Sequence, residues 1–178
     1  WRPPGWIREW KRYPAPRGRR RDSGREEACA LSTESRSRAL LVLAALDLTD
    51  AIGFEAVSAA LSHLADAVLE AGLAIARSRE PDAGDCRLAV IAMGKTGGNE
   101  LNYISDVDVI FVAEPSEGRT EAEALRVATH LATGLMHATN AATADGTIWE
   151  VDPNLRPEGR NGALVRTVNS HVEYYKRW

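Results

Sequence analysis

The chain has 178 residues, of which 44% are hydrophobic and 26% charged, and its formal net charge is −3 at pH 7. This length allows one domain with a core of its own or a small domain with appendages, and the composition excludes disordered and fibrous proteins. No uninterrupted apolar run approaches the roughly 20 residues that span a bilayer, so we expect no membrane partner. Cys29 and Cys86 lie far apart, without metal-ligand or redox spacing. A cytoplasmic location is therefore expected.

Positive charge is concentrated in residues 1–27, which carry nine Lys or Arg against four Asp or Glu and leave 13 against 21 in the rest. An acidic body argues against a broad nucleic-acid surface, so we expect no nucleic-acid partner. We interpret the basic, Pro-containing residues 1–31 as a poorly ordered tail or the remnant of a neighbouring segment. Because residue 1 is Trp rather than Met, we interpret the chain as a fragment of a longer one.

Two helices are predicted over residues 32–81. Residues 32–48 have the Ala and Leu content of a helix. In residues 55–77, apolar side chains recur at alternating steps of four and three and form one stripe: Val57, Leu61, Leu64, Val68, Ala71 and Ile75. Pro81 ends the second helix, and the pair is predicted to form a hairpin beside the following domain. A helix face that binds a partner is the alternative.

Residues 86–166 have the pattern of a mixed domain. Short apolar runs predict strands over 87–93, 106–113 and 147–152. Thr120 and Glu123 have the spacing of a capping box and predict a helix that begins there and continues to about Asn140. Residues 167–178 are predicted to begin a further helix, and since the sequence stops within it, we expect this chain alone to have weak activity or none.

Asp106 and Asp108 lie two apart on a predicted strand, so their side chains leave the same face. Val107, Val109 and Phe111 occupy the opposite face. Close carboxylates resist joint ionisation unless a positive group compensates, and hard oxygen ligands suit Mg²⁺ or Mn²⁺. An isolated Asp-x-Asp also fits an exposed strand start, so the hypothesis of a metal site depends on the neighbouring motifs.

A glycine-rich loop, GKTGG, lies upstream of this pair at residues 94–98. Backbone N–H groups of such a loop can bind phosphate, especially if a short helix begins at Asn99 or Glu100. A plain strand-to-helix turn, in which Gly supplies a positive φ, is the alternative. The loop lacks the first Gly of a P-loop.

The third predicted strand carries Glu150 and Asp152, again two apart. It offers a third carboxylate from a neighbouring strand. The order of strand, Gly loop, Asp-x-Asp strand, helix and acidic strand is the nucleotidyltransferase arrangement shared with DNA polymerase beta. The fold class expected is therefore α+β, with a mixed sheet, flanking helices and a preceding helical hairpin.

The string AMGKTGGNELNYISDVDVIFVAEP, followed by WEVDPNLRPEGRNGALVRT and YYKRW, resembles the glutamine synthetase adenylyltransferase family. Members of that family add AMP to a tyrosine of glutamine synthetase and remove it, using two such domains in one long chain. The resemblance covers about residues 36–178. ELNY, Met93 before Gly94, and RNGALVRTVNSH are more similar to the N-terminal, adenylyl-removing domain of actinobacterial members.

The resemblance implies metal-binding and catalytic roles for Asp106, Asp108 and Asp152. It also implies nucleotide contacts for five further residues: Gly94, Lys95, Gly97, Gly98 and Arg156. Glu150 is expected to support the site. For Arg156 and Arg160, contact with phosphate, pairing with the acidic cluster and a structural salt bridge remain alternatives. Thr96, Pro153 and Asn154 depart from the family's usual residues.

The expected function is therefore metal-dependent removal of AMP from adenylyl-tyrosine by orthophosphate, which releases ADP. The implied cofactor is Mg²⁺, or Mn²⁺, and the implied partners are glutamine synthetase, ATP or ADP, orthophosphate and, through a longer chain, a nitrogen-signalling regulatory protein. ATP-dependent adenylylation by the same site and an inert nucleotide-binding module are alternatives. A sugar-nucleotide transferase is disfavoured by the Gly loop.

Overall fold

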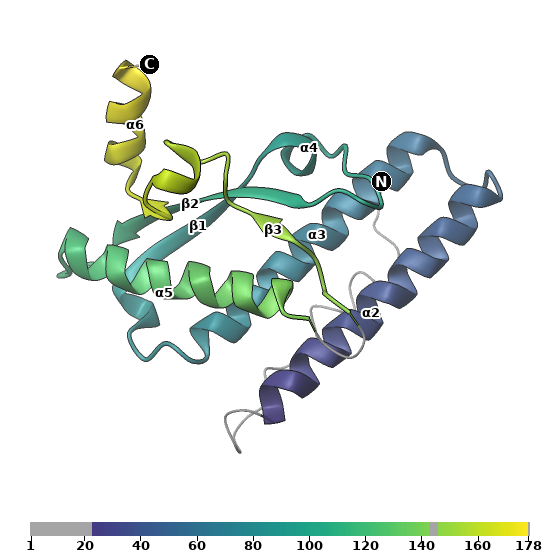
Figure 1. Ribbon diagram of the computed structural model, residues 1–178, viewed down its shortest axis with the longest axis horizontal. Helices are drawn as coiled ribbons and strands as arrows, with labels where there is room; N and C mark the ends of the chain where they lie inside the picture. Colours follow the sequence, from purple (N-terminus) through teal and green to yellow (C-terminus); the bar gives the residue numbers. More distant parts are fainter. Residues whose placement is uncertain (1–22, 143–145, 178) are drawn as a thin grey trace.

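The computed structural model describes residues 23–142 and 146–177 of the chain (Figure 1). Helices and a mixed four-stranded sheet form an α+β fold, which confirms the fold class expected from the sequence. The helices and strands, with two short 3₁₀ helices between them, are α2 (Ser23–Leu48), α3 (Phe54–Arg77), β1 (Cys86–Ala92), α4 (Gly94–Gly97), β2 (Val107–Pro115), α5 (Glu121–Asn140), β3 (Val151–Asp152), β4 (Val165–Arg166) and α6 (Val168–Arg177).

The predicted helical hairpin is present, with one difference at its start. Helix α2 begins at Ser23 rather than Ser32, so part of the segment expected to be a poorly ordered tail is helical. Residues 1–22, the rest of that predicted tail, lie outside the described residues. Figure 1 shows α2 and α3 running side by side, joined by a short turn.

Helix α3 is long and apolar enough, by length and composition, to cross a membrane, although the sequence has no uninterrupted apolar run of that length. Half of its most apolar segment is buried, and the helix packs against α5 and α2. Small residues permit the close contact: a Cβ at Gly72 would lie 3.2 Å from Cγ2 of Thr139 on α5. This burial is that of a core helix in a folded domain.

Strand β2 is the centre of the sheet. Strand β1 pairs with it antiparallel from Cys86 opposite Pro115 to Ala92 opposite Val109. Along its other edge β2 pairs in parallel with two short strands, first β3 and then β4. The strand predicted over 147–152 is thus reduced to its last two residues, because Trp149 donates its backbone N–H to the carbonyl of Thr139 on α5. Strand β4 was not predicted.

The core lies between the sheet and the pair α3 and α5. The predicted inward face of β2 is buried, with Val107, Val109 and Phe111 each at most 1% exposed, and Ile110 on the opposite face is buried as well, at 8%. The capping box at the start of α5 is confirmed: Thr120 Oγ1 accepts from the Glu123 N–H at 3.3 Å, and the Glu123 carboxylate accepts from the Thr120 N–H at 2.9 Å. Asp108, on the opposite face of β2 from the buried valines, is only partly buried.

Candidate metal and nucleotide site

Asp106 and Asp108 leave the same face at the start of β2, opposite the buried valines. The indole N–H of Trp149, a buried residue, donates to the carbonyl of Ser105 at 2.8 Å. This bond fixes the backbone directly before Asp106. The sequence did not predict this role of Trp149. The residue pattern around a tryptophan does not indicate which backbone carbonyl, far away in the sequence, its indole N–H will contact.

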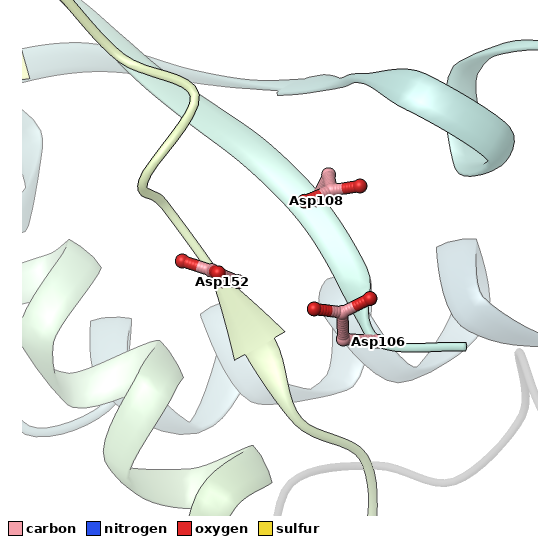
Figure 2. A group of neighbouring side chains, drawn as sticks. All are labelled: Asp106, Asp108 and Asp152. Atoms are coloured by element: carbon pink, nitrogen blue, oxygen red, sulfur yellow. The ribbon is translucent and has the colours of Figure 1, made fainter. Parts of the chain in front are cut away.

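Asp152 completes the acidic group from the neighbouring strand. The parallel register places it opposite Asp108, and the Val107 N–H donates to the carbonyl of Glu150 at 2.8 Å. One carboxylate oxygen from each of Asp106, Asp108 and Asp152 lies within 4.8 Å of the others. Figure 2 shows the three side chains at adjoining positions on β2 and β3. The structure therefore brings together the three carboxylates that the sequence singled out.

Burial raises the pKa of the Asp108 carboxyl, and the charges of Asp106 and Asp152 raise that pKa further. The ammonium of Lys95 acts in the opposite direction. Its Nζ lies 3.4 Å from Oγ of Ser105. The folded protein thus holds three acids in a partly buried group where full ionisation is costly, and a bound cation would relieve that cost.

The Gly loop differs from its prediction in where its helix begins. Helix α4 starts at Gly94 itself rather than at Asn99 or Glu100. The backbone N–H groups of Gly97 and Gly98 donate to the carbonyls of Met93 and Gly94, so these two amides already have partners within the chain. The amides of the first turn have no acceptor within the helix.

Close contacts require glycine at two positions of this loop, and at Gly94 the backbone conformation requires it as well. Gly94 has φ +51°, and a Cβ there would lie 2.9 Å from Oδ2 of Asp108. A Cβ at Gly97 would lie 2.6 Å from the carbonyl oxygen of Ala92. The loop backbone therefore lies directly against the acidic group, and a larger residue at position 94 would displace the Asp108 carboxylate.

Arg156 binds its own loop. Its guanidinium donates to the carbonyls of Pro153 at 2.9 Å, Gly162 at 3.2 Å and Arg160 at 3.3 Å. These hydrogen bonds close residues 153–162 into a compact turn directly after Asp152. A phosphate contact by Arg156 stays a prediction, and the bonds observed hold the loop in shape.

Asp152 is also constrained by the residues that follow it. The N–H of Asn154 donates to Oδ1 of Asp152 at 2.8 Å, which leaves the other carboxylate oxygen and one lone pair for a ligand. The side chain of Glu150 is exposed, and the contact that Glu150 contributes to the site is its backbone carbonyl on Val107. Within residues 34–142 and 146–177, where side chains are described, Asp106, Asp108 and Asp152 are the one group of three potential metal ligands found.

Comparison with protein families matches residues 9–178 to the family described as glutamate-ammonia ligase adenylyltransferase. A bifunctional glutamine synthetase adenylyltransferase/adenylyl-removing enzyme of Streptomyces avermitilis is 56% identical over 142 residues, which is 79% of this chain and 14% of that protein. Proteins of the same name from Cutibacterium acnes and Mycolicibacterium smegmatis are 51% and 50% identical, over 70% and 78% of this chain and 13% and 14% of those proteins. The chain therefore spans about a seventh of the length of these relatives.

Proposed function

Because the chain belongs to the glutamate-ammonia ligase adenylyltransferase family, we propose that it transfers nucleotidyl groups and controls glutamine synthetase. The observation that carries this proposal is the convergence of Asp106, Asp108 and Asp152 within 4.8 Å at one end of the sheet. Proteins that transfer phosphoryl or nucleotidyl groups need concentrated negative charge on the protein to hold the cations that accompany phosphate.

The donor set fits Mg²⁺ or Mn²⁺, which prefer hard oxygen ligands. The carboxylates of Asp106, Asp108 and Asp152 would hold the cation, and burial together with the charges of Asp106 and Asp152 raises the pKa of Asp108, which is consistent with a site that favours a nearby positive charge. When bound, such a cation screens the charge of phosphate and stabilises the charge that develops at phosphorus. Lys95 and the backbone N–H groups of residues 94–96 are proposed to contact nucleotide phosphate, since Gly94 lies directly against Asp108 and the Gly97 and Gly98 amides already have partners.

For the direction of the reaction, we infer removal of AMP. An oxygen of orthophosphate attacks the phosphorus of adenylyl-tyrosine, the bond from that phosphorus to the tyrosine oxygen breaks, and the products are ADP and a tyrosine that takes up a proton. The support is the similarity of ELNY, of Met93 before Gly94 and of RNGALVRTVNSH to adenylyl-removing domains. With nucleotides and glutamine synthetase as partners, the proposed location is the cytoplasm.

ATP-dependent adenylylation is the second candidate. The relatives' name states both activities. Addition and removal of AMP both proceed by attack at the phosphorus of the AMP group, so the same acidic group can serve either reaction. A nitrogen-signalling regulatory protein remains a proposed partner of the longer relatives alone.

The deciding experiment assays both directions. The chain is incubated with adenylylated glutamine synthetase, orthophosphate and Mg²⁺, and separately with unmodified glutamine synthetase, ATP and Mg²⁺, while ADP and pyrophosphate release are followed. Because the chain spans 14% of the Streptomyces avermitilis relative, both assays are repeated on that protein with the aligned aspartates changed.

Asp106→Asn is expected to reduce phosphate-dependent ADP release on the order of a thousandfold, since it removes a charge that acts on the transition state. ATP-dependent adenylylation by the long relative should persist. Glu117→Gln, which removes an exposed carboxylate from the turn after β2, is the matched control. Loss of adenylylation with removal unaffected would reverse the assigned direction, and activity unaffected in both assays would refute the proposed site.

A further inference from the structure

Strand β3 consists of Val151 and Asp152 alone, and a two-residue strand has little intrinsic stability. On one side β2 holds it through the parallel register at Val107 and Asp108. On the other side there is no further strand in the sheet order that the described residues form. On that side, the N–H and the carbonyl of Val151 form hydrogen bonds with a side chain.

That side chain is Asn140, the last residue of α5. Its Oδ1 accepts from the Val151 N–H at 2.9 Å, and its Nδ2 donates to the Val151 carbonyl at 3.3 Å. An amide offers one acceptor and one donor group, so it pairs with a residue's backbone as a neighbouring strand would. Only this orientation of the amide satisfies both backbone groups.

The amide of Asn140 is itself held from the helix. Oγ1 of Thr139 lies 3.0 Å from Oδ1 of Asn140, and the carbonyl of Thr139 accepts from the Trp149 N–H at 3.2 Å. The end of α5 is anchored in the core by Leu135 and Ala138, which are at most 3% exposed. A rigid helix end therefore reaches the backbone next to the third carboxylate.

We propose that Asn140 is a positioning residue for the metal site: its amide fixes the Val151 backbone and thereby directs Asp152 toward Asp106 and Asp108. This inference rests on the proposed function, because it assigns Asn140 to the same acidic group. The three ligand oxygens come from two strands, and the position of Asp152 relative to the other two depends on where β3 lies. Removal of a group that hydrogen-bonds a metal ligand directly usually changes metal affinity about 10–100-fold, and Asn140 acts one residue away from its ligand, so we expect a change toward the lower end of that range.

The test compares Asn140→Ala with Val127→Ala in the full chain. Val127 is fully buried on the same helix, about 20 Å from Asn140 along the axis, so its truncation lowers stability without touching β3. Mn²⁺ affinity is measured from the electron paramagnetic resonance of free Mn²⁺, and exchange of the Val151 amide hydrogen by NMR. Asn140→Ala is expected to weaken Mn²⁺ binding at least tenfold and to accelerate Val151 exchange, while Val127→Ala leaves Mn²⁺ affinity within twofold of wild type.

Wild-type Mn²⁺ affinity in Asn140→Ala would overturn the inference, and so would an equal loss in Val127→Ala, which would reduce the effect to general stability. A wild-type chain with no affinity for Mn²⁺ would overturn both this inference and the metal site on which it rests. Mn²⁺ binding that Asn140→Ala weakens, in a protein that transfers no AMP, would refute the proposed function and leave the positioning role of Asn140 in place.

Discussion

Replacing Asp108 by Asn is expected to stabilise the metal-free protein and to remove its response to metal. In the wild type, burial and then the charges of Asp106 and Asp152 raise the pKa of the Asp108 carboxyl, so ionised Asp108 opposes folding. The asparagine has nearly the same shape and carries no charge. The direction is therefore opposite to that of most substitutions, which destabilise.

The size of the effect follows from the separation of the carboxylates. Two unit charges 4.8 Å apart repel by about 0.9 kcal/mol at the dielectric constant of water, and Asp108 faces two such neighbours. Loss of the attraction to Lys95 and screening by salt both reduce the gain, which leaves a net stabilisation of about 1 kcal/mol at low ionic strength. For a protein of this size, that corresponds to a rise in Tm of about 2–4 °C.

The pH dependence has a definite sign. Because the folded protein binds a proton at Asp108 more readily than the unfolded chain does, this carboxyl favours the folded state increasingly as pH falls through its raised pKa. The stability difference between Asp108→Asn and wild type should therefore be largest at neutral pH and disappear in acid. Added Mg²⁺ should stabilise the wild type by about 2.7 kcal/mol at 100 times its Kd, and the variant much less.

Thermal unfolding is followed by circular dichroism at low and physiological salt, with and without Mg²⁺ or Mn²⁺, and Glu117→Gln serves as a control of equal charge change. A lower Tm for metal-free Asp108→Asn would refute the electrostatic reasoning. A metal-dependent rise in Tm that is as large in the variant as in the wild type would place the metal elsewhere.

Three further substitutions test the elements around the site. Gly94→Ala should lower the free energy of unfolding by about 1–2 kcal/mol, because φ at this position is +51°. It should also weaken Mn²⁺ binding, because the new Cβ would contact the Asp108 carboxylate. An unchanged Tm and an unchanged Mn²⁺ titration would contradict this prediction. Arg156→Ala should accelerate proteolysis of the loop after Asp152, because it removes the guanidinium that binds the loop's carbonyls. Arg160→Ala, which keeps the carbonyl that Arg156 binds, should not accelerate proteolysis. Equal cleavage of the two variants would show that the guanidinium does not hold the loop. Thr120→Ala should cost about 1 kcal/mol in urea unfolding and leave Mn²⁺ affinity unchanged, so a loss of affinity would couple the far end of α5 to the site.

Several elements follow from local sequence alone. The alternation of Val107, Val109 and Phe111 with Asp106 and Asp108 predicted a buried face and an acidic opposite face at the start of β2, and that is the arrangement observed there. The capping box and the start of α6 at Val168 were likewise found where short-range signals placed them. These signals work because a strand's period and a helix cap depend on residues only a few positions apart.

The tertiary structure decided which distant groups meet. The sequence offered Asp152 as a third carboxylate, but its place beside Asp106 and Asp108 depends on the parallel register of a two-residue strand. That strand is held by Asn140, a residue whose local pattern marks only a helix end. The existence of β4 has the same origin. Each depends on hydrogen bonds between segments far apart in the chain, and local periodicity carries no information about which partner a backbone group will find.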